Sequence, residues 1–162
     1  MKITVVADSH KDFHTLKAIA EANTDTDLFI HLGDGQYELI DIANLYPNMK
    51  FVFVKGNVDH GSIKEERVIT VGGHKIFCAH GHTLDVHDGL DKLLDKAMFH
   101  ECKIALYGHT HIYKTDFIGG IYVMNPGSVS EPRGKNPATY GVVETVDDDV
   151  NATIKMSIVE IN

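Results

Sequence analysis

Short apolar runs that alternate with helical patterns limit the folds open to the first third of the chain. The runs lie at 2–7, 27–32 and 50–55, and their near-continuous apolar character is typical of strands buried on both faces. Between them, apolar residues recur three and four positions apart, as in helices, at Phe13, Leu16, Ile19 and Ala20 and again at Tyr37, Ile40 and Ala43. The pattern predicts a βαβαβ unit with a parallel sheet.

The second half holds more strand-like runs than helical ones. Runs at 65–71 and 75–80 flank Gly72, Gly73 and His74, which indicate a hairpin. A third helix is predicted from an apolar face of Leu90, Leu93, Leu94, Ala97 and Met98. Further strands are expected at 103–107, 113–118, 121–125, 138–145 and 152–161, with turns at Gly119 and Gly120 and at Asp147, Asp148 and Asp149. We expect one α/β domain over 1–162, largely antiparallel in its second half, with two packed sheets and helices outside.

The composition and net charge limit the kinds of partner that we expect for this protein and its cellular location. The 162 residues include 15 Lys and Arg against 23 Asp and Glu, and the net charge of −8 disfavours a stable nucleic-acid complex. No apolar run is long enough to cross a bilayer, and the run from Ile3 to Ala7 is too short for a signal peptide. We therefore expect a cytoplasmic protein without membrane contact, in which Cys78 and Cys102 are thiols.

Five predicted strands end in turns that carry Asp, Asn or His. These residues are Asp8, His10, Asp34, Asn57, Asp59, His80, His82, His109 and His111. Each has an ordinary alternative: Asp8 or Asp12 as a helix cap, Asp34 in a simple turn, Asn57 in the left-handed conformation, and a histidine as a hydrogen-bonded structural residue. Ligands of open α/β sheets bind beyond the carboxyl ends of the strands, so the five turns together favour one shared site.

The chemistry of these side chains favours metal ions. Carboxylate and amide oxygens with four imidazoles are too many ligands for one ion and suit two. A mixture of nitrogen and oxygen ligands favours Mn, Fe, Ni, Co or Zn over Mg or Ca, and the absence of clustered thiols argues against structural zinc.

The motifs at these turns resemble those of the calcineurin-like metallophosphoesterase superfamily. They read Asp8-x-His10, Gly33-Asp34, Gly56-Asn57-x-Asp59, His80-Gly81-His82 and Gly108-His109-x-His111. The segment 125–134 and the short chain resemble the YfcE-like small phosphodiesterase branch of that superfamily. The resemblance implies a four-layer α/β/β/α sandwich of two mixed sheets, and hydrolysis of a phosphodiester by a metal-activated hydroxide.

The resemblance also implies a ligand assignment. One ion is held by Asp8, His10, Asp34 and His111, and the second by Asp34, Asn57, His80 and His109, with Asp34 bridging. Mn²⁺ is the expected ion, with Ni²⁺, Co²⁺, Fe²⁺ or Zn²⁺ as alternatives. Residues two apart in a strand-like turn point the same way, so His109 and His111 can each reach a different ion of the pair.

One position departs from the wider superfamily. Many members carry a histidine after the Asn that is thought to protonate the leaving group, but this chain has Val58, as the YfcE-like branch tends to lack that histidine. The role of Asp59, which would orient that histidine, is then open. We expect protonation of the leaving group to be weak, or to come from His82, His60 or water. Esters with good leaving groups should then be cleaved, and alkyl phosphates should turn over slowly.

The expected site is completed by residues outside the ligand set. Asn57, Asp59 and His82 are the catalytic candidates, with Asn57 stabilising charge on the phosphoryl oxygens. Arg133 either contacts the substrate phosphate or ties down its own turn.

A second class of function is a catalytically weak metal-binding scaffold for protein partners, because the retromer scaffold subunit resembles this branch. All seven expected metal ligands are present, which favours the enzyme. The expected partners are a small phosphodiester substrate and further copies of the chain, in a homodimer or homotetramer.

Overall fold

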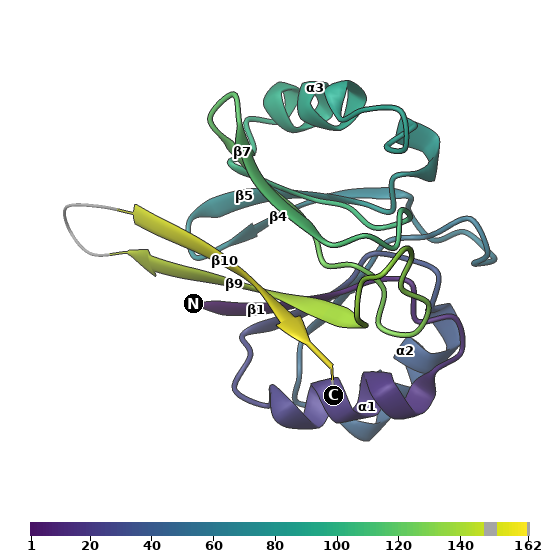
Figure 1. Cartoon of the computed structure of the whole chain (residues 1–162). Helices are drawn as coiled ribbons and strands as arrows, with labels where there is room; N and C mark the ends of the chain where they lie inside the picture. The colour runs from purple at the N-terminus through teal and green to yellow at the C-terminus, as the bar shows by residue number, and fades with distance from the viewer. Residues whose placement is uncertain (148–151, 162) are drawn as a thin grey trace.

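Two five-stranded sheets pack face to face, with helices on both outer surfaces. The computed structural model describes residues 1–147 and 152–161. Helices α1 (Phe13–Ala22) and α2 (Gln36–Leu45) cover one sheet, and α3 (Asp91–Phe99) covers the other (Figure 1). The predicted four-layer α/β/β/α arrangement is therefore confirmed.

The first sheet contains the predicted βαβαβ unit. Its strands are β1 (Lys2–Val6), β2 (Leu28–His31), β3 (Phe51–Phe53), β9 (Thr139–Asp147) and β10 (Ala152–Glu160), in the order β10-β9-β1-β2-β3. Strands β1, β2 and β3 are parallel, and β9 pairs antiparallel with both β1 and β10. Of the acidic turn predicted after β9, Asp147 ends the strand and Asp148 and Asp149 lie outside the described residues.

The second sheet is less antiparallel than the sequence suggested. Its strands are β4 (Glu66–Val71), β5 (His74–Ala79), β6 (Ile104–Leu106), β7 (Lys114–Ile118) and β8 (Ile121–Asn125), in the order β4-β5-β6-β8-β7. The two predicted hairpins, β4 with β5 and β7 with β8, are antiparallel, but β5, β6 and β8 run parallel. The expectation of a largely antiparallel half is wrong for this centre, because α3 carries the chain back across the sheet between β5 and β6.

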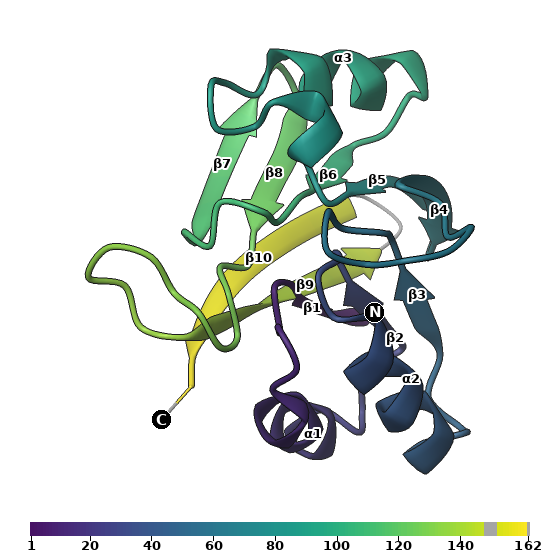
Figure 2. The same ribbon diagram turned by 90° about the vertical axis from the view of Figure 1, so that its right-hand side faces the viewer.

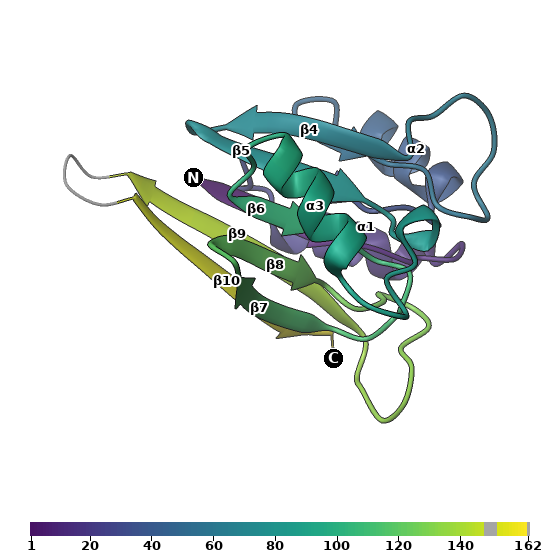
Figure 3. The same cartoon turned by 90° about the horizontal axis from the view of Figure 1, so that it is seen from above.

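The strand ends of both sheets meet at one edge of the molecule. Val6 pairs with His31 and His31 with Phe53, so β1, β2 and β3 end level with one another. In the second sheet, Figure 3 shows β6 and β8 pointing toward the edge where the long loops gather, and Figure 2 views that side of the molecule. The loops that follow five strands are therefore brought together over the space between the sheets.

The main core lies between the two sheets. Alternate residues of β1 face the second sheet, where Ile3 and Val5 pack in one cluster with Ile76 and Cys78. Val6 instead packs under the helices, with Leu16, Ile19 and Ile42. Burial on both faces explains why the strands read as continuous apolar runs. Cys78 and Cys102 are buried free thiols, as predicted.

Two helical faces differ from those expected. Helix α2 buries Glu38, Leu39 and Ile42, whereas Tyr37 and Ile40, expected in the core, are 60% and 49% exposed. The helix is rotated because Glu38 is held inward by hydrogen bonds from Ser9 and Lys11.

On α3 the buried residues are Leu93 and Ala97. Met98, which was expected in the core, is 54% exposed near the end of the helix. Among the described residues, no helix is both long and apolar enough to cross a membrane.

Candidate metal centre

The turns that follow the strands bring carboxylates and imidazoles of both sheets together. Two groups of possible ligands form, Asp8 with His10 and His111, and Asp8 with Asp34 and His80, with ligand atoms all within 4.8 Å of one another in each group. Asp8 belongs to both groups. The alternative that Asp8 caps the first helix is wrong, since Asp12 is that cap and accepts from Thr15 N.

The backbone of these turns is unusual. Eight described non-glycine residues have positive φ, and five of them are ligand candidates: Asp8, His10, Asp34, His109 and His111. Such a conformation costs roughly 1–2 kcal/mol in a residue with a Cβ and is concentrated at functional sites. Asn57, offered as a left-handed residue from the sequence, is not among them. Because His109 and His111 have positive φ, their turn is not strand-like. The argument that they point the same way because they lie two apart in a strand-like turn is therefore wrong.

Asp8 has one buried carboxylate oxygen that has no hydrogen-bond partner among the described residues. Its Oδ2 atom accepts from His109 N at 3.0 Å, while Oδ1 is buried and has no hydrogen-bond partner among the described residues. Oδ1 lies 3.4 Å from His111 Nε2 and 3.9 Å from His80 Nε2. Burial raises the pKa of Asp8 to about 7, with the charge of Asp34 adding to the rise. A bound metal ion would remove this penalty.

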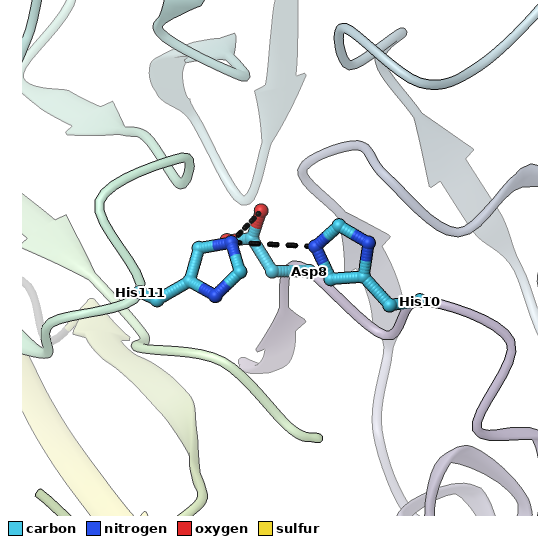
Figure 4. Close-up of side chains that lie close together, drawn as sticks. All are labelled: Asp8, His10 and His111. Atoms are coloured by element: carbon cyan, nitrogen blue, oxygen red, sulfur yellow. Dashed lines mark hydrogen bonds and ion pairs between the residues drawn. The ribbon is translucent and has the colours of Figure 1, made fainter. Parts of the chain in front are cut away.

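His111 presents a lone pair to the same point. Its Nδ1 atom donates to the Glu131 carbonyl at 2.6 Å, so Nε2 is unprotonated in the neutral ring. His111 Nε2 lies 3.3 Å from His10 Nε2 and faces Asp8 (Figure 4). The three side chains thus turn ligand atoms toward one position.

His80 is held in the same way in the second group. Its Nδ1 atom donates to the Leu32 carbonyl at 2.7 Å, which leaves Nε2 facing Asn57 Oδ1 at 3.1 Å and Asp34 Oδ2 at 3.4 Å. Burial opposes the charged form of His80, but Asp34 and Asp8 outweigh it and raise the pKa. A positive charge is therefore favoured here, as a proton or as a metal ion.

Asp34 lies between the two groups. Its Oδ1 atom accepts from Val58 N at 2.9 Å, while Oδ2 lies 3.4 Å from His80 Nε2 and 3.9 Å from His10 Nε2. Burial opposes ionisation, but the neighbouring His80 lowers the pKa of Asp34 to about 2. Bridging by Asp34 stays a prediction, and Asp8 is a second carboxylate that faces both groups.

Asp59 positions the ligand loops. Its two oxygens accept from four backbone amides, those of Asp34 at 2.7 Å, Gly35 at 3.1 Å, Gln36 at 3.0 Å and Gly56 at 2.8 Å. The carboxylate thus ties the Asp34 loop, the start of α2 and the turn after β3 together. Gly56 is needed there because a Cβ would lie 2.1 Å from Asp34 Oδ1.

A chain of buried hydrogen bonds lies behind the site, and sequence reasoning did not predict Ser9 or Glu38 as its members. Gly33 N donates to His31 Nδ1, so His31 Nε2 donates to Ser9 Oγ at 2.8 Å, and Ser9 donates to Glu38 Oε1 at 2.6 Å. The same Glu38 oxygen accepts from Lys11 N at 2.7 Å. These hydrogen bonds fix the turn that carries His10. The position of Ser9 beside Asp8 is a sequence signal for such a contact, but nothing in the sequence indicates that Glu38 is buried here.

The segment at 125–134 braces the ligand turns. Asn125 Nδ2 donates to the Gly108 carbonyl at 2.9 Å and to Thr110 Oγ1 at 3.0 Å. Ser128 Oγ donates to the Asp8 carbonyl at 2.7 Å.

The remaining candidates surround the centre. The His109 ring centroid lies 5.0 Å from that of His80 and 4.8 Å from that of His87, and burial with these neighbours lowers the pKa of His109 to about 4. The His82 ring lies 5.3 Å from that of His80. The exposed Arg133 acts from a distance, since its charge lowers the pKa of His111 after the larger effect of burial.

The fold and the centre together define a class of protein: a two-sheet α/β protein that assembles nitrogen and oxygen metal ligands on its strand ends. The chain matches the calcineurin-like phosphoesterase superfamily domain over residues 1–148 and belongs to that family. The probable metallophosphoesterase YsnB of Bacillus subtilis is 32% identical over 157 residues, which cover 96% of this chain and 89% of the relative.

Solved structures agree with this membership. A predicted phosphoesterase from Streptococcus pneumoniae TIGR4 superposes with a TM-score of 0.80 at 32% identity, covering 96% of this chain and 87% of that one. YfcE, a phosphoesterase from Escherichia coli, has a TM-score of 0.66 at 25% identity over the whole of both chains. Vps29 of Entamoeba histolytica in complex with zinc has a TM-score of 0.73 at 24% identity over the whole of both chains, a likeness of fold.

Proposed function

We propose that this protein is a phosphodiesterase that works with two divalent metal ions held between the sheets. The observation that carries the proposal is the buried, unpartnered Oδ1 atom of Asp8, which faces ring nitrogens of His111 and His80. Acceptor atoms that converge in a buried site need a cation between them. Membership of the phosphoesterase family supports the class of reaction.

The residues of the chain have separable roles in this reaction. Two bound ions supply Lewis-acid charge for the phosphoryl oxygens and lower the pKa of a water. Asp8 and Asp34 supply negative charge between the ligand groups, and the histidines complete the ligand sets. Asn57, whose Oδ1 atom faces His80, is exposed and keeps its amide N–H groups for a phosphoryl oxygen. Arg133 adds a positive charge at the rim.

Protonation of the leaving group is the weak part of this site. Val58, which follows Asn57, is 50% exposed and has no proton to donate. His82 lies beside His80, and His60 lines a surface hollow that Asp34 also lines, so these two histidines and water are the sources left. Diesters with good leaving groups are therefore the preferred substrates, and alkyl phosphates turn over slowly.

The same proposal covers the identity of the metal ion, the cellular location, the partners and the oligomeric state of the protein. Mn²⁺ fits the mixed nitrogen and oxygen ligands, with Ni²⁺, Co²⁺, Fe²⁺ or Zn²⁺ as alternatives. A cytoplasmic location, a small phosphodiester substrate, no stable complex with nucleic acid or membrane, and a homodimer or homotetramer stay predictions from the sequence.

The second candidate function is a metal-binding scaffold for protein partners. Val58 favours it, because that side chain offers no acid for catalysis, and the fold is shared with Vps29. The intact ligand set favours the enzyme instead.

A metal-reconstitution assay separates the two functions. The protein is stripped with a chelator, reloaded with Mn²⁺, and assayed on bis-p-nitrophenyl phosphate beside p-nitrophenyl phosphate, with Asp34→Ala as the variant and Asp41→Asn on the exposed side of α2 as the control. The enzyme predicts Mn²⁺-dependent cleavage of the diester, lost in Asp34→Ala and kept in Asp41→Asn. Bound metal without hydrolysis under Mn²⁺, Ni²⁺ or Co²⁺ would favour the scaffold.

A further inference from the structure

A hollow of about 450 Å³ opens beside the metal centre. His10 and Asp34 line it, so it is continuous with the candidate ligands, and Gln36, Tyr37 and Val58 form part of its wall. Its size falls in the range of small-molecule sites. A substituent on a phosphoryl group at the metal centre would lie next to this hollow.

The wall of the hollow carries apolar side chains that the core does not use. Tyr37 is 60% exposed although it lies in the first turn of α2, whose buried side is formed by Leu39 and Ile42. Val58 is 50% exposed on the turn after β3. An exposed aromatic ring and an exposed aliphatic side chain beside a candidate active site offer a stacking surface for a flat group.

Hydrogen-bond donors line the same hollow. Gln36 Oε1 accepts from His60 N at 2.9 Å, which fixes the amide and leaves its NH₂ group for a ligand. Lys11 is exposed there, and within the described part of the chain no carboxylate pairs with its ammonium group. These donors suit acceptor atoms at the edge of a ring and disfavour a lipid chain.

We propose that this hollow binds a flat aromatic group esterified to the phosphate, so that the substrates are aryl- or nucleoside-type phosphodiesters rather than alkyl or lipid diesters. The inference rests on the proposed function for the position of the phosphate and adds the identity of its substituent. Tyr37 is the residue that selects the aromatic group, by stacking, and Val58 is the second apolar contact.

Binding of two phosphonates tests the hollow without any turnover. Mn²⁺-loaded protein is titrated by calorimetry with phenylphosphonate and with methylphosphonate, which resist hydrolysis and differ in carrying a phenyl or a methyl group on phosphorus. We expect phenylphosphonate to bind roughly tenfold more tightly, as a stacked ring contributes. Tyr37→Ala removes the preference and Tyr37→Phe keeps it. Ile40→Ala, on the same helix but outside the hollow, keeps it as well.

The outcomes distinguish this inference from the proposed function. Equal affinity of the wild-type protein for both phosphonates overturns the aromatic subsite and leaves the phosphate site intact. A preference that survives in Tyr37→Ala overturns the assignment of the hollow. If neither phosphonate binds the Mn²⁺-loaded protein, the phosphate site itself is wrong and both proposals are overturned.

Discussion

At the scale of the residue, Asp59 shows how a side chain serves a site without facing its ligand atoms. Both of its oxygens are occupied by backbone amides from two ligand loops, including those of Asp34 and Gly56. The sequence predicted an acidic residue at this position of the site. It did not predict its partners, because backbone amides of distant loops leave no mark in the pattern of side chains.

Replacement of Asp59 by Asn tests this positioning role. The amide keeps one acceptor and turns an NH₂ group toward backbone N–H donors, so we expect a loss of about 2 kcal/mol in the free energy of unfolding. Mn²⁺ affinity should fall with it, since Asp34 loses its support. Urea unfolding and metal titration measure both, with Asp41→Asn on the exposed side of α2 as control. An Asp59→Asn protein as stable as the control would contradict the role.

The raised pKa of Asp8 predicts how the metal-free protein responds to pH. The pKa of Asp8 in the folded state is about 7, against an ordinary value of 3.8. The neutral carboxyl therefore stabilises the metal-free fold fully below pH 3.8, and this stability is lost as the pH rises from there through about 7. We expect the chelator-treated wild type to lose up to about 4 kcal/mol over this range relative to Asp8→Asn, which stays neutral. Urea unfolding at several pH values measures the difference. Parallel pH profiles for the two proteins would refute it.

At the scale of the element, the start of α2 is coupled to the turn that carries His10. Glu38 on the first turn of the helix accepts through one oxygen from both Ser9 and Lys11. This contact rotates the helix, buries Glu38, and leaves Tyr37 facing the hollow. The existence of the helix was predictable from its apolar spacing. Its buried face was not, because a buried glutamate reads as a surface residue in the sequence.

Two substitutions of Glu38 separate its hydrogen bonds from its charge. Glu38→Gln keeps an oxygen that can accept both bonds, so it should stay within about 1 kcal/mol of wild type. Glu38→Ala leaves the donors of Ser9 and Lys11 unsatisfied and should cost about 2–3 kcal/mol, with weaker Mn²⁺ binding through His10. Thermal unfolding and metal titration report both effects. Equal losses in the two variants would show that the charge matters rather than the bonds.

At the scale of the whole molecule, the candidate metal ligands come from both sheets. Asp8, His10 and Asp34 follow strands of the first sheet, and His80 and His111 follow strands of the second. The sequence predicted this convergence because parallel strands end at a common edge. The strand directions predicted for the second sheet were partly wrong, because the crossover through α3 makes its central strands β5, β6 and β8 parallel.

Metal removal should therefore loosen the packing of one sheet on the other. With Mn²⁺ at about a hundred times its dissociation constant, binding to the folded state alone contributes about 2.7 kcal/mol for each site. Chelation should lower the midpoint of thermal unfolding of the wild type and lower that of Asp34→Ala less, because this variant loses a ligand of the group formed by Asp8, Asp34 and His80. A chelator-insensitive wild-type protein would contradict metal binding between the sheets.

The central claim is that two ions lie between the sheets on the strand-end ligands. The most direct measurement is an anomalous difference map from Mn²⁺-soaked crystals, collected at the manganese edge. The account predicts two peaks about 3.5–4 Å apart, one beside Asp8, His10 and His111 and the other beside Asp8, Asp34 and His80. A single peak, or none at these residues, would contradict it.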